Sequence, residues 1–493
     1  MKHNLKYDLI IKNVNVVQAQ KNVTESVDIA IKDGKIAALE FNLCADDALE
    51  IHDGKGQSAF PGVVDAHMHI GIYHELSWDA YRESQACAQG GVTTSLNYMR
   101  TGKYYLNKSG SYANFFPEVL ALSKGQFHVD YGFHLAPMSA EHIDEIPMLV
   151  SDFGVTSFKI FMFYGGHGLH GASSNQRDFL MIGPEDRYDI AHFEFIMRKI
   201  ANLQEERPHL KEHLSLSLHC ETAEIMTAYT KLVESEGKLS GLRAYSASRP
   251  QHSEGMAIWM ASYLANETNC VNINLLHLTS RKALDAALKM QKLFPHISFK
   301  REVTLGHLLL DVDSPGGLFA KVNPPIRPRE DVEALWESLI EGDIDWVVSD
   351  HACCSHEQKI DARAPKNIFA AKSGFGGTEY LLTGLITEGK KRGLSKPKIA
   401  QLLSLNPSRR YGLPTKGDIA VGLDADIALV DTENSYVVQA KKSFSSAGYS
   451  CFDGMEFNAK VSSTYLRGEI VYSDGKIRTR GRGQFIARPH GLL

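Results

Sequence analysis

The sequence predicts an α/β protein, a TIM-like (β/α)8 barrel with a small β-sandwich domain formed by both chain ends. One observation is that short apolar segments alternate with longer amphipathic ones through the middle of the chain. Another is that the most notable polar residues follow the ends of the apolar segments, where a barrel builds its site. A doubly wound open sheet is the structural alternative.

The two ends of the chain have a different texture from the middle. Residues 7–17, 26–39 and 49–60 have the pattern of short strands, with an Asp-Gly turn inside the second stretch. The last eighty residues repeat this pattern in "DADIALVD" and "VSSTYLRGEIVYSDGKI". We therefore expect residues 1–60 and 415–493 to pair into one β-sandwich domain and residues 61–414 to form the barrel.

Eight apolar segments in the middle of the chain are predicted barrel strands. Helix-like segments such as "SWDAYRESQACAQ" and "SEGMAIWMASYLANE" lie between them. The predicted strands cover residues 58–69, 91–99, 127–136, 154–163, 213–220, 271–278, 296–303 and 344–350.

Composition narrows the class of protein. The 493 residues are 43% hydrophobic and 23% charged, which is ordinary for a globular chain. A net charge of −5 offers no basic field for nucleic acid, and no apolar run is long enough for a membrane span. Seven cysteines without a CxxC pair favour reduced thiols. These features predict a cytoplasmic protein with neither nucleic acid nor membrane as partner.

The fourth predicted strand contains a lysine among apolar residues. In "GVTSFKIFMFYGG", Lys159 is the only charged residue of a run of aromatic and aliphatic side chains. A buried ammonium without a partner is costly, so this lysine must reach the rim, pair with an anion, lose its proton or be chemically changed.

Five further polar residues stand at predicted strand ends. Each taken alone has an ordinary structural explanation, such as a hydrogen-bonded histidine or a carboxylate that caps a loop. Closing the barrel would bring them together with Lys159 at one mouth, and imidazole and carboxylate suit Zn²⁺ and similar ions. Six ligands exceed one tetrahedral site, so the count fits two metals. The residues are His67, His69, Lys159, His219, His277 and Asp350.

The order of these motifs resembles that of the cyclic amidohydrolases, the group of dihydropyrimidinase (hydantoinase), allantoinase and dihydroorotase. The resemblance covers nearly the whole chain, and the C-terminal "LLSLNPSRRYGLPTKGDIAVGLDADIALVD" is similar to the closing sandwich of that group. The motifs that carry it are "PGVVDAHMHIG", "SFKIFMFY", "LHCE", "LHLTS", "KVNPPIR" and "SDHA".

The resemblance implies a binuclear site, usually of zinc. His67 and His69 would bind the more buried ion, and His219 and His277 the more exposed one. Lys159 would be carboxylated by CO₂ to N6-carboxylysine, and its carbamate would bridge both ions. A neutral amine, favoured by burial, can form this carbamate, whereas a protonated one would be repelled by a dication.

The resemblance also implies a mechanism. A hydroxide that bridges the metals would attack a ring amide, with Tyr164 as oxyanion donor and Asp350 as metal ligand and proton shuttle. Asn323 and Ser373 would contact the ring, Ser373 through its backbone. Strict strand alternation puts Lys159 and Tyr164 on opposite faces, so the chain must leave strand geometry by Tyr164.

Some residues differ from those that are usual in the cyclic amidohydrolases. Gly71 stands where dihydroorotases usually carry an arginine for the substrate carboxylate, although "KVNPPIR" resembles the dihydroorotase version of its loop. Cys353 and Cys354 replace the usual residues after "SDHA" and are interpreted as inert small residues or as part of the pocket wall. Residues 165–178 form a glycine- and histidine-rich loop, a solvated lid or a substrate contact, and its GxGxxG match is interpreted as coincidence.

The expected activity is therefore hydrolysis of a cyclic amide or ureide, a dihydropyrimidine or hydantoin-like ring, because "SFKIFMFY" is most similar to dihydropyrimidinase. Another ring is the alternative: allantoin, a cyclic imide, a lactam or dihydroorotate. A non-enzymatic dihydropyrimidinase-like scaffold is a further alternative, disfavoured because the six ligand positions are filled. By resemblance the chain would assemble as a tetramer or dimer.

Overall fold

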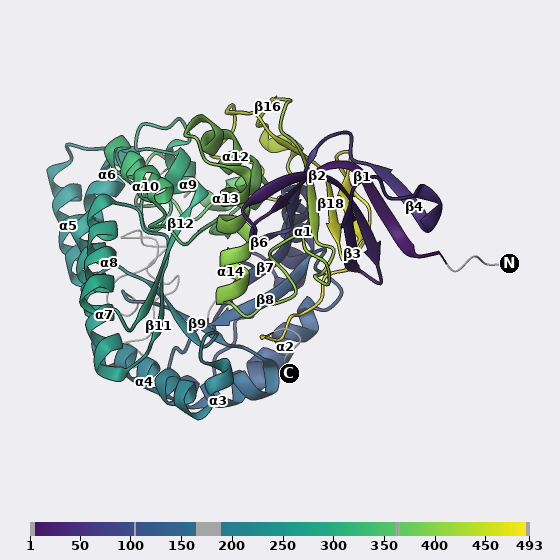
Figure 1. The fold of residues 1–493 in the computed structure, drawn as a ribbon. Helices are drawn as coiled ribbons and strands as arrows, with labels where there is room; N and C mark the ends of the chain where they lie inside the picture. The colour runs from purple at the N-terminus through teal and green to yellow at the C-terminus, as the bar shows by residue number, and fades with distance from the viewer. Residues whose placement is uncertain (1–4, 103–104, 164–188, 361, 363–364, 490–493) are drawn as a thin grey trace.

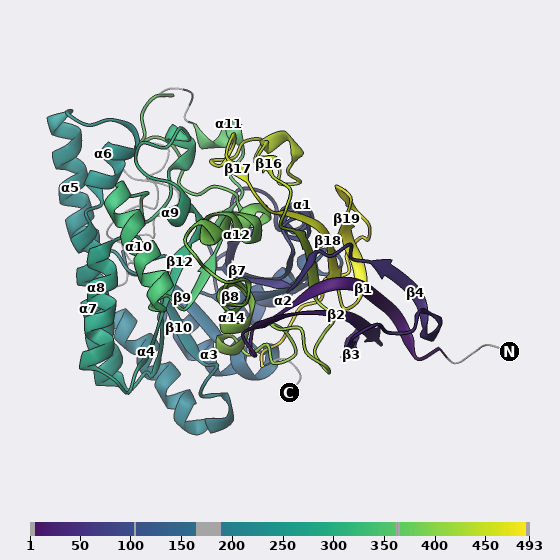
Figure 2. The same cartoon turned by 45° about the horizontal axis from the view of Figure 1, so that its top comes forward.

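A computed structural model describes residues 5–102, 105–163, 189–360, 362 and 365–489. Two large sheets organise this part of the chain (Figure 1). One carries the middle of the sequence and is surrounded by helices, and the other contains strands from both chain ends. In Figure 2 the purple N-terminal and yellow C-terminal strands lie side by side at one flank of the barrel.

The barrel sheet contains the eight predicted strands in sequence order, and every pairing within it is parallel. Its fold class agrees with the prediction of a (β/α)8 barrel and excludes the open doubly wound sheet. The strands are β6 (Val63–His69), β7 (Val92–Met99), β8 (Asp130–Leu135), β9 (Ser157–Phe161), β10 (Ser215–His219), β11 (Asn272–Leu275), β12 (Ser298–Thr304), and the two-part eighth strand β13 (Trp346–Val348) and β14 (His351–Ala352).

The eighth strand is interrupted at Ser349 and Asp350. Before the interruption, β13 pairs with β12, and after it, β14 pairs with β6 through only two residue pairs. Asp350 adopts a left-handed backbone conformation with φ 52°. The first part of the strand thus pairs with β12 and the second part with β6, which closes the barrel. Between the two parts the chain turns at Asp350, a predicted site residue.

The first predicted barrel strand is two strands in two sheets. Residues 58–61 form β5 (Ser58–Pro61), which pairs with β1 and β15 outside the barrel. The chain changes sheets at Gly62, whose N–H donates to Asp426 O. A Cβ on Gly62 would lie 2.1 Å from Thr93 Oγ1, so only glycine permits this approach.

The second sheet joins residues that are far apart in sequence. Its order is β20-β19-β18-β15-β5-β1-β2-β3, with β4 paired to β1. The expectation that both chain ends pair holds at the level of these strands, and the domain boundaries remain a prediction. The other strands of this sheet are β1 (Tyr7–Gln18), β2 (Val23–Lys32), β3 (Lys35–Glu40), β4 (Ala48–Asp53), β15 (Ile427–Asp431), β18 (Lys460–Leu466), β19 (Glu469–Ser473) and β20 (Lys476–Ile477). A short separate pair is β16 (Tyr436–Val437) with β17 (Glu456–Phe457).

Helices surround the barrel sheet (Figure 1). The long ones carry the predicted amphipathic segments, and in the described part of the chain none is long and apolar enough to cross a membrane. They are α1 (Leu76–Gln89), α2 (Tyr112–Ser123), α3 (Ala140–Phe153), α4 (Ile190–Glu206), α5 (Ala223–Glu236), α6 (Gly241–Ser248), α7 (Gln251–Thr268), α8 (Arg281–Leu293), α9 (Leu305–Leu309), α10 (Arg329–Glu341), α11 (His356–Lys359), α12 (Leu381–Lys391), α13 (Lys396–Ala400) and α14 (Asn406–Arg410).

A buried ion cluster ties the barrel to the second sheet. Lys416 donates to Asp130 Oδ2 at 2.8 Å and to Asp426 Oδ2 at 2.6 Å, and it lies 3.4 Å from Asp424 Oδ2. Asp130 is the first residue of β8, whereas Asp424 and Asp426 precede β15. Lys416 is thus a cation held by carboxylates of both sheets.

Candidate active site

The six predicted metal ligands converge at the carboxyl ends of the barrel strands. His69 and His219 are the last residues of their strands, and His277 and Asp350 follow theirs by two positions. All six side chains belong to residues that are at most 9% exposed. His67, His277 and Asp350 each offer a ligand atom within 4.8 Å of the others. The geometry that barrel closure predicts is therefore present.

His67 is oriented by a buried carboxylate. Its Nδ1 lies 2.7 Å from Glu302 Oε1, so Nδ1–H donates to Glu302 and the lone pair of Nε2 faces the cluster. Glu302 also accepts from the backbone N–H of His277 at 3.2 Å and from Trp346 Nε1 at 2.9 Å. One carboxylate thus fixes two of the histidine positions.

Asp350 and Lys159 meet the first histidine pair. Asp350 Oδ1 lies 3.1 Å from His67 Nε2 and 3.3 Å from His69 Nε2. Lys159 Nζ contacts His67 Nε2 and lies 3.4 Å from His69 Nε2. The lone pair of His67 Nε2 accepts the hydrogen bond from the Lys159 amine in this contact.

The second histidine pair lies beside the first. The rings of His219 and His277 have centroids 4.3 Å apart, and those of His67 and His277 are 5.4 Å apart. His219 Nε2 lies 2.6 Å from Glu221 Oε2, which leaves its Nδ1 as the possible ligand atom. This pairing repeats the carboxylate support that Glu302 gives to His67.

Several buried ring nitrogens in the cluster lack hydrogen-bond partners. Among the described residues, Nδ1 of His69, His219 and His277 are in this state. Leaving a buried polar atom unsatisfied costs free energy, and a metal ion is a partner that an imidazole lone pair can satisfy. The donor set therefore fits divalent metal binding.

Electrostatics keeps His69, His219, His277 and Asp350 in the form that binds metal, whereas for His67 burial and Lys159 lower the pKa but Asp350 and Glu302 raise it by more. Burial lowers the pKa of His69 to about 3 and that of His219 to about 4, and it holds the pKa of His277 well below its usual value. Burial alone would raise the pKa of Asp350, but His67 and His69 hold it well below its usual range. Neutral imidazoles and an ionised carboxylate are the ligating forms.

Burial also acts on Lys159. It lowers the pKa of the lysine to about 8 in spite of the opposing charges of Asp350 and Glu302. A sizeable neutral fraction is therefore present near neutral pH, and the neutral amine is the form that reacts with CO₂. The structure thus satisfies the condition for the predicted carbamate.

Two of the site residues have unusual backbone conformations. His277 has φ 34° and Asp350 has φ 52°, in the left-handed region that non-glycine residues rarely adopt. Such strain persists where the surrounding structure requires it, which is often at functional sites. Here it turns both side chains toward the cluster from positions just beyond their strands.

A small cavity opens beside the cluster. His69, His219, His277 and Asp350 line it together with Asn323 and Ser373. The predicted substrate contacts therefore adjoin the predicted metal ligands. The remaining lining residues are Ile72, Tyr73, Phe161, Val322, Ala352 and Gly374.

The remaining predicted site features are Tyr164, the loop that follows it and the adjacent cysteines Cys353 and Cys354. Tyr164 and the loop 165–178 lie outside the described residues. Strand β9 ends at Phe161, so the chain leaves strand geometry before Tyr164, as alternation required. Cys353 and Cys354 are buried but do not line the cavity, and Cys353 Sγ lies 3.0 Å from Ser446 Oγ.

Sequence reasoning missed the residues that support the ligands. Glu302 and Glu221 hold histidines, and Arg249 in turn donates to both oxygens of Glu221, at 2.9 and 2.5 Å. Glu221 could have been found as an acid two residues after His219, whereas Glu302 follows Lys300 and Arg301 in its predicted strand and does not stand out as a lone charge. Arg249 gives no comparable signal, since only the fold places it there.

Comparisons with known proteins decide the family. The profile of the Amidohydrolase family matches residues 58–471. The chain belongs to this family. An allantoinase from Escherichia coli is 30% identical over 492 residues, which cover 98% of this chain and 99% of the relative.

Solved structures agree in fold. An L-hydantoinase (dihydropyrimidinase) from Arthrobacter aurescens is 26% identical, with a TM-score of 0.83 over 97% of this chain and 99% of that one. A dihydropyrimidinase from Brevibacillus agri has the same TM-score at 24% identity and covers 98% of both chains. The predicted cyclic amidohydrolase is therefore confirmed: this family member is a hydrolase that acts on cyclic amides.

Proposed function

We propose that the protein opens a dihydropyrimidine or hydantoin-like ring by hydrolysing its amide bond at a centre of two divalent metal ions. The observation that carries this proposal is a cluster of four buried histidines, one carboxylate and a lysine of lowered pKa, three of whose histidines and the carboxylate line one cavity. The metal identity that best suits this imidazole-rich donor set is zinc.

The ligands would divide between the two ions as the resemblance implies. His67 and His69 would hold one ion together with Asp350, and His219 and His277 the other. The N6-carboxylated Lys159 would supply a shared anionic ligand. Support comes from the partnerless ring nitrogens and from the contact of Lys159 with His67. Bound ions would lower the pKa of a water molecule and polarise the ring carbonyl.

The protein's own residues would then bind the ring and move a proton. Asp350 is ionised and reaches the cavity, so its carboxylate can take the proton of the attacking water and deliver it to the leaving ring nitrogen. Asn323 and Ser373, which also line the cavity, would hold the ring. Tyr164 is the proposed donor to the oxyanion.

Allantoin is a second candidate substrate. The observation that favours it is the 30% identity to an allantoinase over nearly the full length of both chains. Allantoin also carries a hydantoin ring, so the same site chemistry would open it. Gly71, which replaces the arginine usual in dihydroorotases, disfavours dihydroorotate.

A substrate panel with a metal assay tests the proposal. Purified protein should contain close to two equivalents of zinc and should open dihydrouracil, hydantoin or allantoin. Dihydroorotate and cyclic imides serve as comparison rings. A chain that takes up less than one metal and hydrolyses none of these rings would contradict the proposal.

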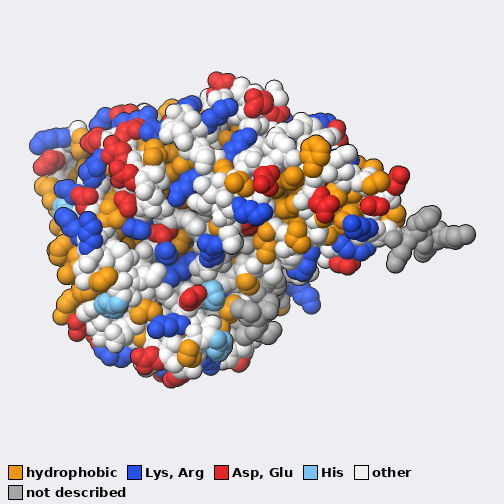
Figure 3. Space-filling model, viewed as in Figure 1, with side chains coloured by type: hydrophobic (Ala, Val, Ile, Leu, Met, Phe, Trp, Pro, Cys, Tyr) orange, Lys and Arg blue, Asp and Glu red, His pale blue; other side chains and the backbone are white. Residues whose placement is uncertain are grey.

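We expect the chain to form a dimer or tetramer. Support comes from an apolar stripe on α7, where Met256, Trp259 and Tyr263 are each more than half exposed. Figure 3 shows orange side chains along the flank where α5 and α7 lie. Exposed apolar patches often mark association surfaces. Trp259→Lys should lower the mass of the assembly measured by sedimentation. An unchanged mass would exclude this stripe as the subunit interface.

A further inference from the structure

Two buried tyrosines hold the residues proposed to bind the ring. Tyr245, on α6, donates its hydroxyl proton to Asn323 Oδ1 and lies 3.5 Å from Ser373 Oγ. Tyr73 donates to the backbone oxygen of Ser373 at 2.6 Å. Tyr73 itself lines the cavity, whereas Tyr245 is buried behind Asn323 and is not among the lining residues.

The direction of the Tyr245 hydrogen bond is set by its other neighbour. Arg249 Nη1 donates to the Tyr245 hydroxyl oxygen at 3.4 Å. A guanidinium only donates, so it occupies the acceptor side of the hydroxyl and leaves the hydroxyl proton for Asn323. Burial raises the pKa of Tyr245, so the hydroxyl keeps this proton at neutral pH.

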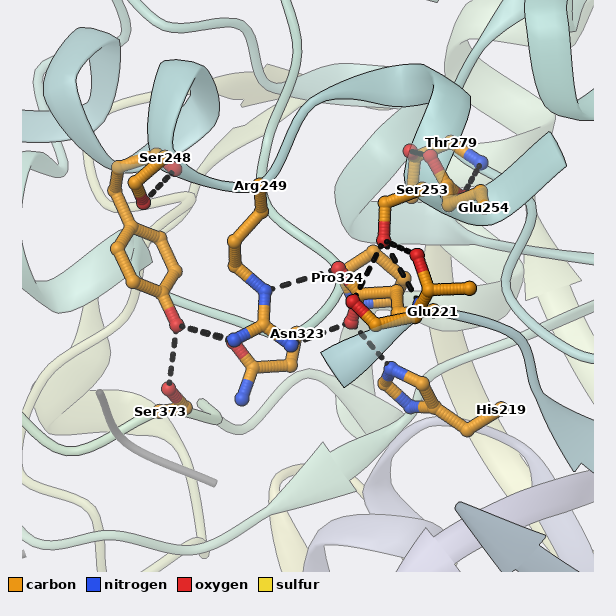
Figure 4. Close-up of polar contacts among 12 residues, drawn as sticks. His219, Glu221, Ser248, Arg249, Ser253, Glu254, Thr279, Asn323, Pro324 and Ser373 are labelled. Carbon is orange, nitrogen blue, oxygen red and sulfur yellow. Dashed lines mark hydrogen bonds and ion pairs between the residues drawn. The ribbon is translucent and has the colours of Figure 1, made fainter. Parts of the chain in front are cut away.

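The arginine that anchors Tyr245 is itself fixed. Arg249 binds both oxygens of Glu221, and Glu221 holds the ring of His219. Figure 4 shows Arg249 and Asn323 lying between Ser373 at one end of this network and His219 at the other. A continuous set of buried contacts therefore runs from a proposed metal ligand to the proposed ring contacts.

The loop that carries Asn323 is fastened to the same helix region. Arg327 donates to the backbone oxygens of Ser246 and Arg249, at 3.2 and 2.5 Å, and to Glu254 Oε2 at 2.8 Å. The backbone of Asn323 is thus held at a fixed distance from α6. Tyr245 is placed to set the rotation of the Asn323 amide.

We propose that Tyr245 is a positioning residue that sets the hydrogen-bonding edge Asn323 offers to the ring. With Oδ1 turned to Tyr245, the Nδ2 donors lie on the other edge of the amide of Asn323, a residue that lines the cavity. Asn323 then recognises a carbonyl oxygen of the ring and discriminates against rings without one at that position. This inference rests on the proposed function. The carbonyl that Asn323 would bind is the ring carbonyl that the water does not attack.

The test compares two rings that differ in this carbonyl. Dihydrouracil has both carbonyls, and tetrahydropyrimidin-4-one keeps only the amide carbonyl that is attacked. In the wild-type enzyme, dihydrouracil should bind at least about tenfold more tightly, because a lost hydrogen bond leaves a buried donor unsatisfied. The measurements are KM for dihydrouracil and the competitive Ki of the second ring.

The decisive variant is Tyr245→Phe, which keeps the ring and removes the hydroxyl. We expect KM for dihydrouracil to rise about tenfold, kcat to change less than about threefold, and the preference between the two rings to fall below about threefold. Asn323→Asp, which replaces the donors by acceptors, should abolish the same preference. A preference unchanged in Tyr245→Phe, or a fall in kcat at constant KM, would overturn the proposal.

A control separates positioning from loss of structure. Tyr465→Phe removes another buried hydroxyl, which lies 3.0 Å from His52 Nδ1 in the second sheet, and should leave the preference intact. Metal content and thermal stability of Tyr245→Phe should match those of the wild type. Failure of the proposed function would give a different result, because the wild-type enzyme would then open no cyclic ureide. In that case the role of Tyr245 in ring binding would be contradicted as well.

Discussion

Lys159 and Lys416 are both buried lysines, yet their surroundings give them opposite chemistry. Lys416 lies among three carboxylates, and although burial lowers its pKa, Asp426 and Asp130 raise it above the usual value by more. Lys159 lies among histidines, and burial dominates. The first lysine remains a cation that joins two sheets. The second can lose its proton, which is the requirement for becoming a ligand.

The comparison shows that burial alone does not define a lysine's role. The fold decides by what it places within a few ångströms of the amine. At the junction of the sheets it supplies anions, so the cation is stabilised and structural. At the mouth of the barrel it supplies the imidazoles of His67 and His69, and the nearby carboxylates of Asp350 and Glu302 already bind histidines. Variants at each lysine should therefore fail in different assays.

The largest effect is expected from Lys159→Ala. The variant should retain less than one metal per chain and lose at least about a thousandfold in kcat/KM, because the proposed shared ligand of the metals would be gone. Metal analysis and turnover measure this. A small carboxylate such as propionate, added at high concentration, should restore part of the activity by filling the vacated space. Full activity without any additive would contradict the carbamate.

Lys416→Met should act on stability instead. Removing the cation leaves three buried carboxylates, at a cost of about 3–5 kcal/mol in the free energy of unfolding measured with urea. The exposed pair of Lys199 with Asp144 is the matched control, and Lys199→Met should cost less than about 1 kcal/mol.

The pH dependence sharpens this prediction. A raised pKa in the folded state means that the stabilisation by Lys416 is complete below the unfolded value of 10.5 and declines as the pH rises from there through the folded value. The difference between wild type and Lys416→Met should therefore stay constant from about pH 7 to pH 9. Metal content per folded chain should be unchanged in Lys416→Met. A loss of metal in this variant would contradict the distinction between a structural Lys416 and a metal-binding Lys159.

Glu302→Gln should have the smallest effect of the three substitutions. The amide keeps the size of the side chain but weakens the hold on His67 Nδ1. Supporting carboxylates of this kind are typically worth about 10- to 100-fold in metal affinity, which competition with a chelator measures. The stability of the folded chain should change less than in Lys416→Met. An unchanged metal affinity would show that His67 is oriented by packing alone.

The sequence predicted the barrel and the candidate ligands because both depend on local patterns. Apolar strands end in histidine or aspartate, and parallel strands bring such ends together. The supporting residues could not be predicted in the same way. Glu302 reaches His67 over 235 positions, and Tyr245 reaches Asn323 over 78, so only the closed barrel reveals these pairs. The change of sheets at Gly62 was also missed, although the turn-prone pair Pro61-Gly62 interrupts residues 58–69 at this point.

The interruption of the eighth strand has a consequence for how the barrel moves. Only His351 and Ala352 close the ring of strands against β6, so this is a seam with few backbone hydrogen bonds, and Asp350 lies at its edge. Seams of this kind open locally at a lower cost than the rest of a barrel. The residue proposed to carry the proton would then sit at a weak line of the wall, where a slight parting of the strands changes its distance to His69, whose backbone pairs with Ala352 across the seam.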